Sequence, residues 1–459
     1  MSRRRRSPLD PLAETPEVRA AAAALVDAVA REASERALTE KQYADAVKSI
    51  GRLRGRPLLL PAIAAGAGRG ARMRLADGTT KLDWIGGIGV YAFGHSDRDL
   101  LETAAIAAAS DVVFQGHLVP GPEYLRVSRA LLRHAGPNLH HVWLSLSGAI
   151  ANENALKVIL QKRHPADRVV AFEGNFAGRT TTLAEITDKP DFRDGLPLRG
   201  NVLLVPFHDA AHPDPIGRSL AALDAHLARH PKQIAAMVFE LVQGEGGIRT
   251  APREFFVALM QRCRAAGVAV WVDEVQTFAR TGELYAFRTL GLEEWVDVVT
   301  VGKVLQGSAA LFSRDLNPRP GLVSGTYAGA TVGMAVGARI IERLEEDGYL
   351  GPEGRIALLG RRVERRFEGL AKRCPDAVSR VEGVGAMYAF VPFDGKAELA
   401  DAVMRAAFEE GLVVFTGGSS PTRVRLLLPV NTTDEELEAG FAMLEKALRR
   451  VAAERGIAC

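Results

Sequence analysis

The chain has 459 residues, of which 47% are hydrophobic and 25% charged, the composition of an ordinary globular protein. Its net charge of +3 is too near neutral to indicate a nucleic-acid partner, because Lys and Arg are spread among Asp and Glu outside the run Arg3 to Arg6. No run of about 18 apolar residues exists, so we expect no membrane span. Three widely spaced cysteines, without metal-ligand spacing, favour a reducing compartment, and we expect the cytoplasm.

The N-terminal part of the chain predicts a helix followed by short strands. Residues 16–33 are rich in Ala, Val, Leu and Arg, which favours a helix. Further on, Asp77-Gly78 lies between partly alternating apolar residues and predicts a hairpin turn. The glycine-rich residues 86–89 form either a flexible connection or backbone that lines a ligand pocket.

Six short apolar runs, rich in β-branched residues, begin at His141. They are HVWLSL, RVVAF, NVLLVPF, IAAMVFE, VAVWVDE and VDVVTVG. Most are separated by segments of helical length and composition, such as residues 152–162, 220–229 and 252–266. Continuous apolar strands that alternate with helices are typical of a parallel sheet covered on both faces. The sequence therefore predicts an α/β fold.

Four of these runs end in polar or ionisable residues. The small residues 147–149 follow the first run, Glu240 ends the fourth, Asp273 lies at the end of the fifth, and Lys303 follows the sixth. Ligands of parallel sheets bind at the carboxyl ends of the strands. We therefore expect these residues to gather on one rim of the sheet.

Lys303 and Asp273 each allow a structural and a chemical interpretation. Lys303 could end a strand and reach solvent, or its neutral amine could attack an aldehyde. Asp273 could pair with an arginine or cap a helix, or its carboxylate could keep a ring nitrogen protonated. Their place on successive strand ends suggests a cofactor with both an aldehyde and a ring nitrogen, such as pyridoxal phosphate.

Two further segments could contact a phosphate. Ser147, Gly148 and Ala149 occupy a strand-to-helix turn, where backbone N–H groups and the positive helix end can meet an anion, although such turns are common. Thr326, in the segment GTYAG, could supply a hydroxyl to the same phosphate or could simply start a helix.

Eight motifs in chain order resemble the class III, or ω-aminotransferase, subgroup of the fold-type I pyridoxal-phosphate enzymes. They are SGAIANENALK, FAGRTTTL, FELVQGEGG, WVDEVQT, ARTGELYAF, VDVVTVGK, GTYAGAT and VRLLLPV. The resemblance implies a large domain with a mostly parallel, seven-stranded sheet over residues 76–330. It also implies an N-terminal helix and small-domain segment in residues 1–75 and a connecting helix with an α+β small domain in residues 331–459.

The resemblance assigns roles to the residues that line the cofactor. It implies that Lys303 forms a Schiff base with pyridoxal phosphate and that Asp273 binds the ring nitrogen. Val275 and Phe176 would pack on the two faces of the ring, while Gln276 would reach its phenolic oxygen.

The phosphate and the substrate take further residues in this resemblance. The backbone of Gly148 and Ala149 would bind the phosphate together with Thr326 from the neighbouring subunit, which implies a homodimer with shared active sites. Arg425 matches the arginine that binds the substrate carboxylate, although it could instead be a surface-facing strand residue. Glu240 and Glu245 match acidic positions, and Glu245 is the one that can pair with this arginine.

The chain departs from the family pattern around the expected substrate. Ile150 replaces a usual glutamate and Ala177 a usual histidine, while the loop 277–282 is shortened. In addition, Lys303 is followed by VLQGSA instead of a glycine run. These departures leave the particular amino donor open.

We therefore expect an aminotransferase that moves an amino group from an amino acid or ω-amino compound to an α-keto acid. A lyase that eliminates ammonia or phosphate, or an epimerase, would use the same cofactor and is the alternative. A cofactor-binding protein without catalysis is a third hypothesis, which the joint presence of Lys303, Asp273, Gln276 and Arg425 disfavours.

Overall fold

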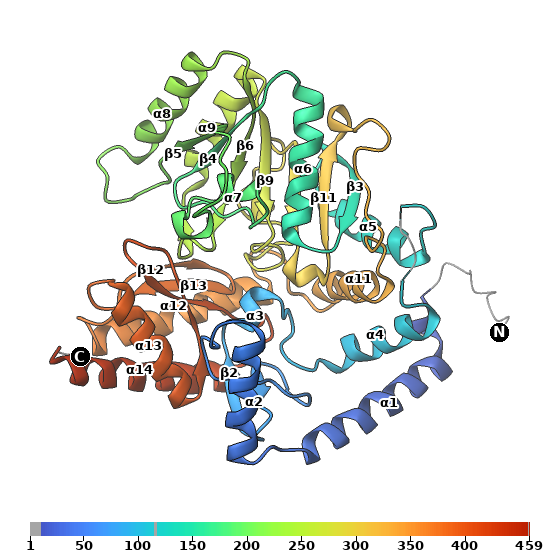
Figure 1. The fold of residues 1–459 in the computed structure, drawn as a ribbon, viewed down its shortest axis with the longest axis vertical. Helices are drawn as coiled ribbons and strands as arrows, with labels where there is room; N and C mark the ends of the chain where they lie inside the picture. Colours follow the sequence, from blue (N-terminus) through green and yellow to red (C-terminus); the bar gives the residue numbers. More distant parts are fainter. Residues whose placement is uncertain (1–10, 114–116, 458) are drawn as a thin grey trace. The chain divides into compact units, whose positions relative to one another are not determined.

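The computed structural model describes residues 11–113, 117–457 and 459, so the basic run at residues 3–6 lies outside the described part. The chain forms two compact units (Figure 1). The first comprises Met1–Ser110, Leu358–Val381 and Gly385–Cys459, and the second comprises Asp111–Ala357 and Glu382–Val384. Within the described ranges, every helix is too short or too polar to cross a membrane. The predicted domain limits at residues 75 and 330 stay a prediction.

The second unit is built on a seven-stranded sheet with strand order β3-β11-β10-β9-β6-β4-β5. Its strands are β3 (Leu139–Ser145), β4 (Arg168–Phe172), β5 (Val202–Val205), β6 (Ile234–Phe239), β9 (Ala269–Glu274), β10 (Val298–Val301) and β11 (Ser308–Ser313). Only β11 runs antiparallel to its neighbours. The prediction of a mostly parallel sheet is confirmed, and all six predicted runs are strands of it.

The helices of this unit separate most of these strands along the chain. They are α5 (Pro122–Arg133), α6 (Gly148–Arg163), α7 (Leu183–Ile186), α8 (Pro215–Arg229), α9 (Arg253–Ala266), α10 (Ala286–Thr289) and α11 (Thr331–Glu346). In Figure 1, α6 lies along the sheet beside β3 and β11, with which it is in contact. Its residues Ala155 and Ile159 are fully buried in the core with Trp271 of β9. A short hairpin, β7 (Val242–Gln243) and β8 (Arg249–Thr250), completes the unit.

The first unit combines helices with two small sheets, of strand order β12-β13-β16-β15 and β1-β2-β14. Its helices are α1 (Pro16–Glu35), α2 (Glu40–Leu53), α3 (Gly86–Gly89), α4 (Arg98–Ser110), α12 (Arg355–Arg373), α13 (Ala397–Glu410) and α14 (Asp434–Arg455). Its strands are β1 (Arg72–Arg74), β2 (Thr80–Asp83), β12 (Ser379–Val384), β13 (Met387–Val391), β14 (Leu412–Val413), β15 (Phe415–Gly417) and β16 (Arg423–Leu427). The predicted hairpin is confirmed, because β1 and β2 pair antiparallel and Gly78 adopts a φ of 86° in their turn.

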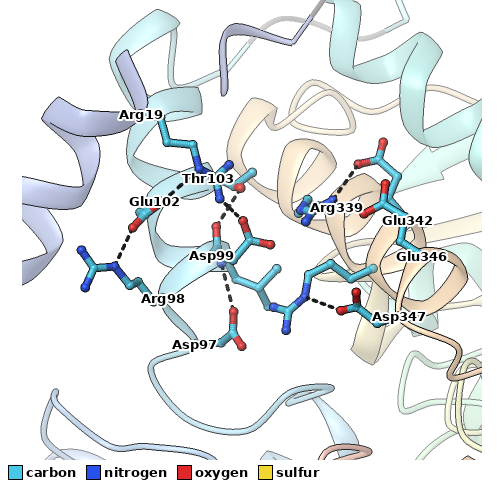
Figure 2. Close-up of polar contacts among 12 residues, drawn as sticks. Arg19, Asp97, Arg98, Asp99, Glu102, Thr103, Arg339, Glu342, Glu346 and Asp347 are labelled. Carbon is cyan, nitrogen blue, oxygen red and sulfur yellow. Dashed lines mark hydrogen bonds and ion pairs between the residues drawn. The ribbon is translucent and has the colours of Figure 1, made fainter. Parts of the chain in front are cut away.

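Ion pairs join α1 and α4 in the first unit, and Figure 2 shows them together with pairs of Arg339 within α11 of the second unit. In the first unit, Arg19 of α1 pairs with Asp99 and Glu102 of α4, and Arg98 also pairs with Glu102. In the second unit, Arg126 of α5 donates from Nε to Glu342 of α11 at 2.7 Å. Both sets are partly exposed, so they orient helices more than they stabilise them.

Candidate active site

Asp273 and Lys303 follow neighbouring parallel strands of the seven-stranded sheet. Asp273 lies on β9 opposite Thr300 of β10 in the strand register, and Lys303 comes two residues after β10 ends. The positive charge of Lys303 lowers the pKa of Asp273, so the two groups interact electrostatically. The predicted meeting of these residues on one rim is therefore observed.

Asp273 is a buried carboxylate held by two donors. Its side chain is 6% exposed, and it accepts hydrogen bonds from Asn152 Nδ2 at 2.7 Å and from the Val275 backbone N at 2.9 Å. Burial raises the pKa of Asp273 to about 6, and the two hydrogen bonds and Lys303 oppose this rise. A buried carboxylate of this kind gains stability from a cation placed beside it, such as a protonated ring nitrogen.

Lys303 begins the short 3-10 helix η3 (Lys303–Leu305) and has a left-handed backbone, with a φ of 49°. Few residues other than glycine adopt this conformation, which costs free energy unless the surroundings enforce it. The side chain of Lys303 is half-buried. Strain at the residue expected to carry the chemistry is consistent with a functional position.

The start of α6 approaches Val275 closely. A Cβ added to Gly148 would lie 2.5 Å from Val275 Cγ1, and one added to Gly302 would lie 3.2 Å from the same atom. Ser147 caps the helix, since its Oγ accepts from the Ile150 N at 3.3 Å. The N–H groups of Gly148 and Ala149 therefore belong to the first turn of a sixteen-residue helix beside Val275, where an anion is stabilised.

Glu240 connects two segments at the end of β6. Its carboxylate accepts from the Phe176 N at 2.7 Å and from the Gly244 N at 3.1 Å. Burial, and next the charge of Asp273, raise the pKa of Glu240 to about 8, with Glu245 adding to the rise. Glu240 therefore fixes the half-buried Phe176 and the turn that carries Glu245, and it lies within electrostatic range of Asp273.

Two buried amide oxygens near Asp273 accept no hydrogen bond from the described residues. They are Gln276 Oε1 and Asn152 Oδ1, on side chains that are 8% and 1% exposed. A Cβ on Gly244 would lie 2.1 Å from Gln276 Oε1, so only glycine leaves room for this amide. Buried polar atoms are nearly always satisfied in native proteins. These amides therefore point to a polar ligand beside Asp273.

Thr326 and Arg425 are the other residues that the sequence predicts for the site. Thr326 is exposed, as is its neighbour Tyr327 at 60%. Arg425 belongs to the first unit, where β16 pairs it with Ala389 of β13 and Phe415 of β15. Arg425 is 0% exposed, so its alternative interpretation as a surface-facing residue is wrong. Its guanidinium carbon lies 5.5 Å from the centre of the Phe415 ring.

Two residues that support the site were not singled out from the sequence. Asn152 donates from Nδ2 to Asp273 and also to Ala177 O at 2.6 Å. Glu274 is 0% exposed and accepts from Thr277 Oγ1 at 2.6 Å and from the Ala286 and Phe287 N atoms at 2.9 Å. Both residues lie inside motifs that carry the family resemblance, and their place in these motifs could have indicated a role in the site.

Comparisons with known proteins point to one family. The model of the aminotransferase class-III family matches residues 57–448. A 2-aminoadipate transaminase from Pseudomonas putida is 30% identical over 83% of this chain and 94% of its own length. An acetylornithine aminotransferase from Thermosynechococcus vestitus is 27% identical over 84% and 92%. A solved lysine aminotransferase from M. tuberculosis, in the internal aldimine form, has a TM-score of 0.79 at 25% identity and covers 88% of this chain and 99% of its own.

The fold and the rim residues define a fold-type I enzyme that depends on pyridoxal phosphate. The chain belongs to the class III aminotransferases. It is a transaminase, and its substrates are amino and keto acids. The residues present fit the cofactor, since a buried carboxylate, an amine, a helix start and two buried amides without partners among the described residues adjoin one another.

Proposed function

We propose that Lys303 Nζ carries pyridoxal phosphate covalently and that Asp273 binds the protonated ring nitrogen. The observation that carries this proposal is the buried Asp273 carboxylate, hydrogen-bonded to Asn152 and electrostatically coupled to Lys303 on the adjacent strand end. Its raised pKa supports a cationic partner, because a positive charge beside a desolvated carboxylate recovers part of the free energy lost on burial.

The other groups of the rim hold the remaining parts of the cofactor in this proposal. The turn of Ser147, Gly148 and Ala149 binds the phosphate, for which the start of α6 is suited. Val275 and Phe176 contact the two faces of the ring, and Phe176 is fixed there through its N–H bond to Glu240. Gln276 donates to the phenolic oxygen through its amide.

When bound, the cofactor supplies an electron sink for the negative charge that develops on the amine-bearing carbon of the substrate. Lys303 Nζ would be the base that takes the proton from this carbon and later returns it. General acid–base catalysis of this kind contributes about 10²- to 10⁴-fold. Asp273 keeps the ring nitrogen protonated throughout, because Asn152 and the Val275 N hold its carboxylate in place.

We further propose that Arg425 binds the substrate carboxylate. Arg425 is 0% exposed, and a guanidinium binds a carboxylate through two parallel hydrogen bonds. The relatives are named for 2-aminoadipate, acetylornithine and 5-aminovalerate, which all carry a carboxylate. The amino donor is therefore an amino acid or ω-amino acid, and the acceptor is an α-keto acid. The assignment of Glu245 to the substrate stays a prediction.

We also propose a homodimer in which Thr326 of the partner subunit completes the phosphate site. Exposed apolar side chains near the start of α6 and beside Thr326 support this proposal, namely Leu146 at 57%, Ile150 at 43% and Tyr327 at 60%. Leu146 and Tyr327 line the same small cavity, so they belong to one region of the unit. The cysteines are unbridged, which suits the reducing cytoplasm that we propose as its location.

Half-reaction screening tests this function. The purified protein, loaded with pyridoxal phosphate, is mixed with single amino acids and ω-amino acids without a keto acid, and the visible absorbance band is followed. A true donor is expected to bleach the band in one turnover, and an α-keto acid should restore it. Continuous turnover without a keto acid would instead identify a lyase. Lys303→Ala should show neither the band nor bleaching, and full activity of this variant would contradict the proposal.

A further inference from the structure

The four residues from Lys303 to Gln306, here called the Lys303 turn, pack against glycines of α11. A Cβ added to Gly337 would lie 2.3 Å from Leu305 O and 3.1 Å from Leu305 Cδ1. A Cβ added to Gly333 would lie 2.6 Å from Gln306 O. Contacts of Cβ atoms below 3.0 Å are essentially never found in proteins, so both positions require glycine unless the turn moves.

The Lys303 turn has little freedom to move away from α11. Val304 and Leu305 are 1% and 3% exposed, and the turn is closed by a hydrogen bond of 3.0 Å from the Gln306 N to Lys303 O. Just before the turn, a Cβ added to Gly302 would lie 3.2 Å from both Val275 Cγ1 and Ser308 Oγ. The turn therefore lies between α11 on one side and Val275 on the other.

The backbone of the turn is strained at both ends. Lys303 and Gln306 have φ values of 49° and 58°, a region that favours glycine. Such conformations persist when surrounding contacts enforce them. Glycine also destabilises a helix relative to alanine, so the buried Gly337 and the half-buried Gly333, one turn before it on α11, imply a function in packing.

We propose that Gly333 and Gly337 are positioning residues for Lys303. Their missing side chains let the Leu305 and Gln306 carbonyls rest on α11, and this contact fixes how far Nζ stands from Asp273. The inference rests on the proposed covalent role of Lys303. It also accounts for the sequence VLQG after Lys303, because glycines on the facing helix provide the room for a turn that carries bulky side chains.

The test compares Gly337→Ala and Gly333→Ala with Gly369→Ala, a control on helix α12. There the added Cβ would meet only the mobile end of Arg373, at 3.3 Å. Each purified variant is titrated with pyridoxal phosphate, and the pH midpoint of its visible band is recorded. Borohydride reduction followed by peptide mass spectrometry then gives the fraction of Lys303 that carries the cofactor. Circular dichroism and thermal unfolding report whether each variant folds.

If the Lys303 turn is displaced, cofactor binding should weaken and the pH midpoint of the visible absorbance band should change. Because a misplacement of about 1 Å can cost about 100-fold in a catalytic step, we expect Gly337→Ala to raise the cofactor Kd at least about tenfold and to move the pH midpoint. Gly333→Ala should do less, since a cavity of about 50 Å³ beside Gln306 gives its contact room to relax. Gly369→Ala should match the wild type.

Each outcome separates the two proposals. Wild-type Kd and midpoint in a folded Gly337→Ala would overturn the positioning role. If Gly337→Ala does not fold, Gly333→Ala decides: an unchanged Kd and midpoint would overturn the role, and a changed midpoint with intact folding would support it. If the wild type itself carries no cofactor on Lys303, the proposed function fails, whereas trapping on Lys303 with identical variants rejects only this inference.

Discussion

Asn152 donates a hydrogen bond of 2.7 Å from Nδ2 to Oδ2 of Asp273. The same nitrogen donates to Ala177 O at 2.6 Å, and the side chain of Asn152 is 1% exposed. Asn152 therefore ties the carboxylate on β9 both to helix α6 and to the segment that carries Phe176. One buried amide thus connects the residues that we propose to bind the phosphate, the ring nitrogen and a face of the ring.

Asn152→Ala is expected to weaken cofactor binding and to raise the pKa of Asp273 further, because its carboxylate loses a donor. Losing a hydrogen bond to a charged group costs about 1.5 to 3 kcal/mol, so the Kd for pyridoxal phosphate should rise about ten- to 100-fold. Titration of the apoprotein at several pH values measures this. Asn201→Ala, which removes an exposed Asn–Asp hydrogen bond of 3.3 Å, is the matched control and should leave the Kd unchanged.

The cofactor-free protein is expected to lose stability as the pH rises from about 4 to about 8. Burial raises the pKa values of Asp273, Glu274 and Glu240 to about 6, 7 and 8. The folded state therefore binds more protons than the unfolded state in this window, so the free energy of unfolding falls with increasing pH. Thermal unfolding across this range, by circular dichroism, measures the slope.

Asp273→Asn should remove the part of this slope that lies between about pH 4 and 6, which corresponds to about 2 to 3 kcal/mol at most. Bound cofactor should also make the free energy of unfolding depend less on pH, since its protonated nitrogen favours the ionised carboxylate of Asp273. A stability that rises with pH over the whole window in the wild-type apoprotein would contradict the burial of these carboxylates.

Gly148→Ala is expected to disturb the phosphate end of the site. The new Cβ would lie 2.5 Å from Val275 Cγ1, so either the start of α6 or Val275, which we propose to contact the ring, must move. Overpacking of this kind costs about 1 to 3 kcal/mol, and we expect a similar loss in affinity for pyridoxal phosphate. Competition of inorganic phosphate with cofactor binding shows whether the phosphate site itself is affected. An unchanged cofactor Kd would argue against a phosphate site at this turn.

Arg425→Lys is expected to raise KM for the amino donor with a smaller change in kcat, because lysine cannot make the bidentate contact. Arg425→Ala should lower kcat/KM at least about 30-fold, the effect of removing one partner of a buried charge pair. Steady-state kinetics with a carboxylate-bearing donor and with a plain alkyl amine separates the two effects, since only the former should respond. Arg423→Lys on the same strand is the control, and thermal unfolding reports folding.

Much of the second unit could be predicted from the sequence because its strands are long apolar runs with helices between them. The missed strand, β11, reads SAALFS and has neither β-branched residues nor alternation, so packing between β3 and β10 determines it. In the first unit, α2 was not predicted, although Tyr43, Val47 and Ile50 recur at helical spacing. Its capping box, in which Thr39 accepts from Gln42, was a second sign of a helix start.

The site was predictable where strand ends carry charge, as at Asp273 and Lys303. Asn152 was not predictable by that rule, because it lies on a helix and acts only through the position of Asp273. The burial of Arg425 also could not be read from spacing, since Arg423 on the same strand has the same chemistry. In the structure β16 pairs with β15 at both arginines and also with β13 at Arg425, and both arginines are buried.

The covalent role of Lys303 is the central claim, and one measurement tests it directly. The protein is loaded with pyridoxal phosphate, reduced with borohydride and digested, and the modified peptide is identified by mass spectrometry. We predict that the reduced cofactor is attached to Lys303 at near one equivalent per chain. Modification at another lysine, or cofactor that dialyses away unattached after reduction, would contradict the account.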